Sequence, residues 1–182
     1  QYTQMMSKPL AASEFCAVLL TAFDLVKEPQ PKLEQPQQLT DLSTKMEQKL
    51  RILVVDDNAV NRMVMAGMLK KCQQTASYAE NGLEAVNMIS TSEEGFDVVF
   101  MDCEMPNMDG YTATQRIRLW EKGKHLTPVL IYGVSAHALT EYQQQGMAAG
   151  MNDFLVKPLK QQDLSRALTQ VMTQLMMQKL AR

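Results

Sequence analysis

The sequence predicts an α/β protein built on a doubly wound parallel sheet, and three observations support this prediction. First, five apolar runs of strand length alternate with five helical patterns between residues 50 and 175. Second, the run at residues 96–101 is almost entirely apolar, as expected of a strand that is buried on both faces. Third, acidic, hydroxyl or cationic residues follow four of the runs, at the sheet edge where such folds bind their ligands.

Two strand–helix units account for residues 50–89. Residues 50–55 form an apolar run, and residues 75–79 form a shorter second strand. A helix is expected between them because apolar residues recur there three and four positions apart, at Val60, Met63, Val64, Met68 and Leu69. A second helix is expected over residues 82–89.

Three further units account for residues 96–175. Strands are expected at residues 96–101, 128–134 and 153–156, and helices at about 111–121 and 138–149. The closing helix carries one apolar stripe, which consists of Leu164, Ala167, Leu168, Val171 and Leu175. Repeated strand–helix units of this kind favour one parallel sheet over separate helical and strand regions.

The overall composition argues against several functional classes. The 182 residues carry 18 basic and 20 acidic side chains, which is a poor basis for a nucleic-acid binder with a broad basic face. The chain has neither an apolar run of 18 residues nor a recognisable signal peptide, so we expect no membrane contact and a cytoplasmic location. Cys16, Cys72 and Cys103 are widely spaced, as expected of reduced thiols and not of a zinc site.

A Pro/Gln-rich stretch divides the chain. Residues 28–48 contain Pro29, Pro31 and Pro36 among polar residues, a composition typical of a semi-extended linker. The linker separates a short apolar segment, residues 1–27, from the patterned body at residues 49–182. The body is therefore expected to carry an N-terminal helical extension.

Three aspartates follow the ends of two expected strands. Asp56 and Asp57 come after the first strand, and Asp102 comes after the third. Because the carboxyl ends of parallel strands share one edge, these carboxylates are expected to converge and to repel one another unless a cation lies between them. Magnesium, a hard ion that prefers oxygen ligands, meets that need. The alternative is that each acid only starts a turn or caps a helix.

Two further side chains are expected at the same edge. Lys157 precedes Pro158, which favours extended backbone at the lysine, so that its ammonium can reach a carboxylate or a phosphoryl oxygen. Ser135 follows the fourth strand, and the small Ala136 leaves room beside its hydroxyl. Taken alone, a lysine or a serine at a strand end is an ordinary surface residue.

Four motifs together allow a family to be recognised. They are Val54-Val55-Asp56-Asp57-Asn58, the segment MDCEMPNMDG at residues 101–110, Val134-Ser135-Ala136, and Phe154-Leu155-Val156-Lys157-Pro158-Leu159. In order and spacing, residues 50–175 resemble the receiver domain of two-component signalling, and specifically the receivers of hybrid sensor histidine kinases. The resemblance implies a flavodoxin-like (βα)5 fold with strand order 2-1-3-4-5.

The resemblance also implies a role for each residue of the site. Asp102 would accept phosphate from a phosphohistidine, and Ser135 and Lys157 would bind the phosphoryl oxygens. Asp56, Asp57, Asp102 and the backbone carbonyl of Glu104 would hold Mg²⁺, with Mn²⁺ as an alternative ion. Such transfer depends mainly on positioning and charge neutralisation, which these groups can supply.

The same family suggests a switch and an output surface. Phe154 matches the aromatic residue whose rotation follows the movement of Ser135 toward the phosphoryl group. The output face would include the fourth helix, the fifth strand and the fifth helix, at about residues 138–173. Glu104 and His137 lie two residues beyond Asp102 and Ser135, and we hypothesise that they tune the lifetime of the phosphate.

An internal repeat suggests what precedes the linker. The segment beginning Lys8-Pro9-Leu10 aligns without gaps with the segment beginning Lys157-Pro158-Leu159. Residues 1–27 would then be the C-terminal remnant of a preceding receiver-like domain, in which Met5 takes the place of Phe154. A chance Lys-Pro-Leu followed by an amphipathic helix is the alternative.

We therefore expect the receiver of a hybrid histidine kinase, which takes phosphate from a histidine kinase and relays it to a histidine phosphotransfer domain. The parent protein would be anchored in the inner membrane. No ATP-binding glycines or Walker A loop are present, so the chain does not make its own phosphohistidine. Three alternatives remain: a stand-alone or transcriptional response regulator, an aspartate-nucleophile phosphatase with Glu104 as general acid, and an interaction module independent of phosphorylation.

Overall fold

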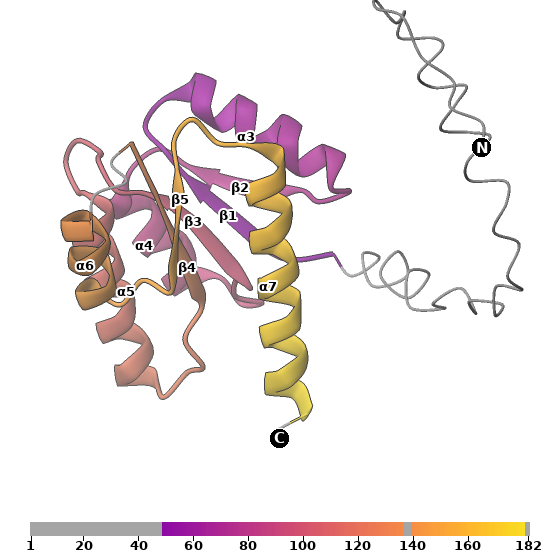
Figure 1. The fold of residues 1–182 in the computed structure, drawn as a ribbon. Helices are drawn as coiled ribbons and strands as arrows, with labels where there is room; N and C mark the ends of the chain where they lie inside the picture. The colour runs from indigo at the N-terminus through magenta and orange to yellow at the C-terminus, as the bar shows by residue number, and fades with distance from the viewer. Residues whose placement is uncertain (1–48, 137–139, 181–182) are drawn as a thin grey trace, which may run out of the picture. The chain divides into compact units, whose positions relative to one another are not determined.

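The computed structural model describes residues 49–136 and 140–180, which form a parallel five-stranded sheet with helices on both faces (Figure 1). The strand order is β2-β1-β3-β4-β5, which confirms the predicted fold class and order. The N-terminal helical extension and the linker predicted for residues 1–48 lie outside the described residues.

The strands are short and lie close to their predicted positions. They are β1 (Ile52–Val55), β2 (Ala76–Ala79), β3 (Val98–Asp102), β4 (Leu130–Ser135) and β5 (Asp153–Val156). The three inner strands β1, β3 and β4 are buried along their whole length. For β3, the apolar sequence of residues 96–101 predicted this burial. Asp102 and Ser135 are the last residues of β3 and β4, so these two polar side chains belong to the strands themselves.

The helices are α3 (Ala59–Lys71), α4 (Gly82–Thr91), α5 (Gly110–Lys124), α6 (Thr140–Ala149) and α7 (Gln161–Leu180). Three of them begin with a capping side chain at the carboxyl edge of the sheet. The side chains of Asn58, Asn81 and Asp109 accept hydrogen bonds from the backbone N–H groups of Val60, Glu84 and Thr112, respectively. None of the helices in the described part of the chain is long and apolar enough to span a bilayer.

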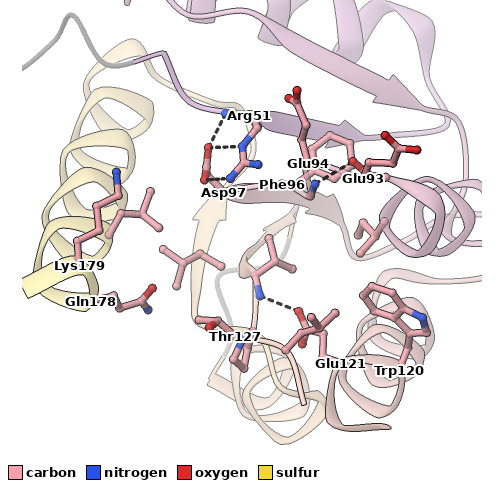
Figure 2. Close-up of a pocket in the computed structure, with 18 residues that line it drawn as sticks. Arg51, Glu93, Glu94, Phe96, Asp97, Trp120, Glu121, Thr127, Gln178 and Lys179 are labelled. Carbon is pink, nitrogen blue, oxygen red and sulfur yellow. Dashed lines mark hydrogen bonds and ion pairs between the residues drawn. The ribbon is translucent and has the colours of Figure 1, made fainter. Parts of the chain in front are cut away.

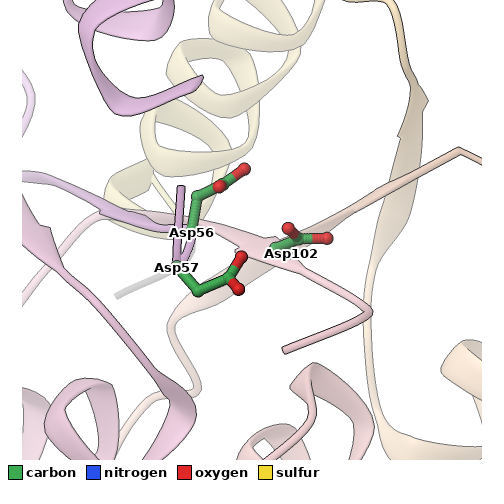
Figure 3. A group of neighbouring side chains, drawn as sticks. All are labelled: Asp56, Asp57 and Asp102. Atoms are coloured by element: carbon green, nitrogen blue, oxygen red, sulfur yellow. The ribbon is translucent and has the colours of Figure 1, made fainter. Parts of the chain in front are cut away.

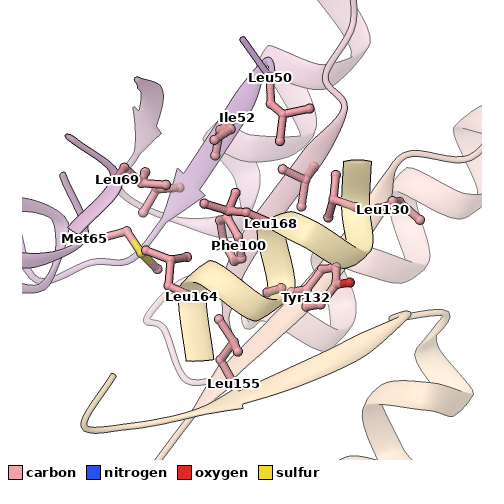
Figure 4. Close-up of a cluster of buried hydrophobic side chains, with 14 of the residues drawn as sticks. Leu50, Ile52, Met65, Leu69, Phe100, Leu130, Tyr132, Leu155, Leu164 and Leu168 are labelled. Atoms are coloured by element: carbon pink, nitrogen blue, oxygen red, sulfur yellow. The ribbon is translucent and has the colours of Figure 1, made fainter. Parts of the chain in front are cut away.

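Alternate residues of each strand contribute to two separate cores. Ile52 and Val54 of β1 face the core beneath α3 and α7, whose buried side chains include Leu69 and Leu164 (Figure 4). The other face of the sheet packs against α4 and α5, and its core is formed by Leu53, Val55, Ala85, Val99, Met101, Ala113, Ile117 and Ile131. With both faces covered, the carboxyl ends of the strands remain open to ligands.

Candidate functional site

The structure brings the three predicted aspartates together at the carboxyl edge of the sheet (Figure 3). One carboxylate oxygen from each of Asp56, Asp57 and Asp102 lies within 4.8 Å of the others. Asp56 and Asp102 are buried, whereas Asp57 is exposed. The parallel registers of β1 with β3 produce this arrangement, because Val55 pairs with Met101 and the aspartates are the next residues.

Lys157 reaches across this edge to two of the carboxylates. Its Nζ lies 3.0 Å from Asp56 Oδ2 and 2.7 Å from Asp102 Oδ2. The backbone N–H of Lys157 donates to the carbonyl of Ser135 at 2.8 Å, which fixes the start of this side chain next to β4. The predicted meeting of Lys157 with the acid cluster is therefore present.

Burial dominates the electrostatics of the cluster. Burial raises the pKa of Asp102 above its ordinary value, and the opposing hydrogen bond from Lys157 does not cancel this effect. Burial alone would lower the pKa of Lys157, but the hydrogen bonds to Asp102 and Asp56 outweigh it and raise that pKa. Lys157 therefore offsets only part of the free-energy cost of burying the charged Asp102 carboxylate. A cation bound at the cluster would offset more of it.

The first turns of α3 hold the Asp56 carboxylate in place. The backbone N–H of Asn58 donates to Asp56 Oδ1 at 2.9 Å, and Asn61 Nδ2 donates to both carboxylate oxygens at 3.0 and 3.1 Å. Arg62 binds the backbone of the same turn. Neither Asn61 nor Arg62 was predicted to support the site, although both are polar residues on the predicted helix directly after the two aspartates.

The Asp102 backbone is held from the opposite side by the start of α5. The N–H of Gly110 donates to the carbonyl of Cys103 at 3.1 Å, and a Cβ at position 110 would collide with the carbonyl oxygen of Asp102. The N–H of Glu104 donates to Asp102 Oδ1 at 3.2 Å. Glycine at this position therefore permits a close backbone approach that supports Asp102.

Of the remaining predicted residues, Ser135 lies at the carboxyl edge and Phe154 lies within the sheet. Ser135 is buried at the end of β4. Phe154 lies on β5, where its ring fits against Gly133 and Gly146: a Cβ added at position 133 would lie 2.5 Å from Phe154 Cε1. His137 lies outside the described residues, so the structure does not place it.

The donor set fits a hard divalent cation. Three carboxylates with oxygens within 4.8 Å of one another are suitable ligands for Mg²⁺, which takes one or two carboxylates and keeps several waters. No nitrogen or sulfur ligand belongs to this group, which disfavours zinc. The acid cluster can therefore hold Mg²⁺.

A different pocket, of about 440 Å³, lies at the opposite edge of the sheet, where the strands begin (Figure 2). Three of its charged residues have partners in the fold. Arg51 binds Asp97 through both its guanidinium and its backbone N–H, and the buried Glu121 accepts hydrogen bonds from Arg118 and from the N–H of Val129. This pairing indicates a structural role for Arg51, Asp97 and Glu121.

Known proteins with similar sequences include sensor histidine kinases. The family model of the response regulator receiver domain matches residues 52–169. Sensor histidine kinase GacS of Pseudomonas protegens is 32% identical over 167 residues, which are 92% of this chain and 17% of that protein. Hybrid signal transduction histidine kinase E of Dictyostelium discoideum is 42% identical over 107 residues, 59% of this chain and 6% of that protein. The chain thus spans less than a fifth of these relatives.

Known structures of similar fold include a magnesium-bound receiver. The receiver domain of sensor histidine kinase PA1611 from Pseudomonas aeruginosa PAO1, with magnesium coordinated in its active site cleft, has 35% identity and a TM-score of 0.61. The match covers 69% of this chain and 99% of that chain. A second similar structure is the co-crystal structure of the Saccharomyces cerevisiae histidine phosphotransfer signaling protein Ypd1 with the receiver domain of Ssk1. The matching chain has 30% identity and a TM-score of 0.63, and the match covers 66% of the present chain and 87% of the matching chain. The chain therefore belongs to the response regulator receiver domain family, and its relatives are hybrid sensor histidine kinases.

Proposed function

We propose that Asp102 is the phosphoacceptor of this receiver. The observation that supports the assignment is the contact of Lys157 with Asp102 inside a cluster of three aspartates. Of the three acids, only Asp102 lies on β3. This strand lies between β1, which Asp56 and Asp57 follow, and β4, which ends at Ser135. A phosphoryl group on Asp102 would therefore have ligands on both sides.

In the proposed transfer, a carboxylate oxygen of Asp102 attacks the phosphorus of a phosphohistidine. The new O–P bond forms as the N–P bond breaks, and the imidazole leaves with the electron pair of that bond. Lys157 and Ser135 bind phosphoryl oxygens, while Asp56, Asp57, Asp102 and the carbonyl of Glu104 hold Mg²⁺ or, alternatively, Mn²⁺. The bound ion would neutralise the charge on the phosphoryl oxygens.

We place the docking of the histidine-bearing partner on the exposed face of α3. Val60, Met63 and Val64 are 65%, 73% and 48% exposed and lie on one face of the helix, at positions i, i+3 and i+4. Val64 of this face lines one cavity together with Asn61 and Asp56, so the face borders the acid cluster. A cavity of about 460 Å³ that Val64, Lys157 and Leu159 help to line continues this surface toward the site. Exposed apolar groups next to a reactive site are suited to binding a helical partner.

The parent protein follows from the same proposal. A hybrid kinase would supply the phosphohistidine, and a histidine phosphotransfer domain would receive the phosphate. Residues 1–27 would be the remnant of a preceding receiver-like domain and residues 28–48 a linker, as the Lys-Pro-Leu repeat suggests. Because ATP-dependent kinases feed this relay, the receiver would work in the cytoplasm, whether or not its parent is anchored in a membrane.

Phosphorylation with a small donor tests the acceptor. The protein is incubated with Mg²⁺ and acetyl phosphate, and intact-mass measurement is expected to find one acid-labile phosphoryl adduct. Asp102→Asn should abolish the adduct, whereas Asp109→Asn, a nearby helix cap, should retain it. An adduct that survives Asp102→Asn would overturn the assignment. Continuous hydrolysis of a simple phosphomonoester would instead support the phosphatase alternative.

A further inference from the structure

Arg62 holds the backbone of the two aspartates that follow β1. Its Nη1 donates to the carbonyl oxygens of Asp56, at 2.7 Å, and of Asp57, at 3.2 Å. Its Nη2 donates to Glu80 Oε1 at 2.6 Å. The Arg62 side chain is only 15% exposed, so the guanidinium lies in the turn between β1 and α3 and not in solvent.

The two carboxylates of the acid pair are supported very differently. Asp56 accepts hydrogen bonds from the N–H of Asn58, from Asn61 and from Lys157. The Asp57 carboxylate is exposed, and within residues 49–136 and 140–180 no donor holds it. The position of the Asp57 carboxylate therefore depends on the backbone of residues 56 and 57, which is the backbone that Arg62 binds.

We propose that Arg62 is a positioning residue that sets the Mg²⁺ affinity of the site through the carbonyl groups of Asp56 and Asp57. The inference rests on the proposed magnesium site. Mg²⁺ requires nearly ideal octahedral geometry, so displacement of a carboxylate by a fraction of an ångström weakens its binding. Groups that orient metal ligands typically contribute about 10- to 100-fold in metal affinity.

Two effects of Arg62 on a bound cation have opposite signs, and this makes the inference testable. As a positive charge beside the site, Arg62 repels Mg²⁺, so its removal would raise the affinity if charge decided the outcome. As a clamp on two carbonyls, it orders the ligands, so its removal lowers the affinity. Lysine keeps the charge but lacks the planar fork that can bind two carbonyls and Glu80 at once. Arg62→Lys therefore isolates the positioning effect.

The chain offers a matched control in Arg118. Its guanidinium also combines a backbone carbonyl with a carboxylate: it donates to the carbonyl of Gly150 at 2.9 Å and to Glu121 Oε2 at 2.7 Å. These partners lie near the strand starts, at the end of the sheet away from the aspartates. Arg118→Lys should weaken the fold in a comparable way without affecting the metal site.

The experiment measures Mg²⁺ binding by calorimetry for the wild type and for five variants: Arg62→Lys, Arg62→Gln, Glu80→Gln, Arg118→Lys and Asp57→Asn. Melting temperatures in EDTA confirm that each variant is folded in the absence of metal. We expect both Arg62 variants to lose about tenfold in Mg²⁺ affinity. Arg118→Lys should stay within about twofold of the wild type. Glu80→Gln should also change little, because Glu80 is 67% exposed and the carbonyl contacts of Arg62 remain.

Two results would overturn the role of Arg62. One is wild-type affinity in Arg62→Lys, and the other is an equal loss in Arg118→Lys, which would indicate a general loosening of the fold. Higher affinity in Arg62→Gln together with wild-type affinity in Arg62→Lys would assign the residue a purely electrostatic effect. Asp57→Asn separates the two proposals: if it leaves the affinity unchanged, the magnesium site itself is wrongly placed.

Discussion

Lys157 Nζ lies 2.7 Å from Asp102 Oδ2, although 55 residues separate the two in the chain. The same ammonium lies 3.0 Å from Asp56 Oδ2, so one cation serves two buried carboxylates. Without this lysine, two negative charges would share one sheet edge with no cation between them, and both are already removed from water. Lys157 therefore stabilises the metal-free site as well as having a proposed role toward the phosphoryl group.

Removal of Lys157 should destabilise the protein most in the absence of Mg²⁺. In EDTA, Lys157→Met is expected to lower the free energy of unfolding by about 2 kcal/mol. This loss is smaller than the loss expected from breaking a fully buried ion pair, because the Lys157 side chain is 24% exposed. Saturating Mg²⁺ should restore part of the loss. Urea denaturation with and without Mg²⁺ measures both effects, and the exposed Lys160→Met is the control. Equal losses with and without Mg²⁺ would contradict this account.

The pair formed by Arg51 and Asp97 should make stability depend on pH. Burial would raise the pKa of Asp97, but the hydrogen bonds from the Arg51 side chain and backbone N–H lower it below its ordinary value. The folded state therefore binds fewer protons than the unfolded state, and this contribution to stability is lost as the pH falls below about 4.

Asp97→Asn should consequently be less stable than the wild type at pH 7, and the difference should shrink as the pH falls below about 4. Thermal unfolding between pH 3 and pH 7, in the absence of metal, measures the difference. Glu93→Gln, at an exposed acid four residues earlier, should differ little from the wild type at any of these pH values. A difference independent of pH would show that packing, not ionisation, is responsible.

The ring of Phe154 should depend on two glycines from other elements. A Cβ at Gly146 would collide with Phe154 Cζ and lie 3.0 Å from Met151 Sδ. Gly146→Ala should therefore cost about 1–3 kcal/mol and displace the ring, and the cost should be smaller in a Phe154→Ala background. A double-mutant cycle by urea denaturation measures the coupling.

Gly67→Ala provides the control for that cycle, because a Cβ there meets no other atom within 4 Å. It should stabilise α3 by up to about 1 kcal/mol, the ordinary gain of alanine over glycine within a helix. If Gly146→Ala has the same cost with and without Phe154, the two residues are not coupled.

The exposed face of α3 should affect phosphotransfer but not phosphorylation by a small donor. Met63→Lys places a charge in the centre of the proposed docking surface, where the methionine is 73% exposed. Transfer from a phosphorylated histidine phosphotransfer protein should slow by about tenfold or more, which corresponds to a loss of about 1.4 kcal/mol or more of interaction energy. Labelling by acetyl phosphate should be unchanged.

Met177→Lys is the matched control for the α3 surface, since Met177 is 67% exposed at the distant end of α7. It should leave both reactions at the wild-type rate. Equal slowing by the two substitutions would place the docking surface elsewhere.

The sequence predicted the fold and the positions of the acids well, because both depend on patterns that repeat along the chain. Apolar runs of strand length identify the buried strands, and parallel strands must bring Asp56 and Asp102 to the same edge. The limits of the closing helix were less predictable. Its buried apolar stripe ended at Leu175, whereas α7 continues to Leu180, because the apolar residues of the last turn, such as Met177 and Leu180, are exposed and pack against no core.

Contacts that depend on the exact approach of two elements could not be predicted. Arg62 is one polar residue among several on α3, and only the turn between β1 and α3 brings its guanidinium to the carbonyls of Asp56 and Asp57. Likewise, Gly133 and Gly146 lie on β4 and α6, and nothing in their spacing links them to the ring of Phe154. Such relationships follow from tertiary packing, not from periodicity.

The bridge between Lys157 and Asp56 spans 101 residues, which has a consequence for biosynthesis. A nascent chain that carries β1 and β3 but has not yet released β5 from the ribosome holds its aspartates without their shared lysine. The lysine-bridged site therefore cannot be completed before β5 and Lys157 have been synthesised. A chain truncated before β5 would contain the proposed phosphoacceptor Asp102 but not the lysine that its carboxylate contacts.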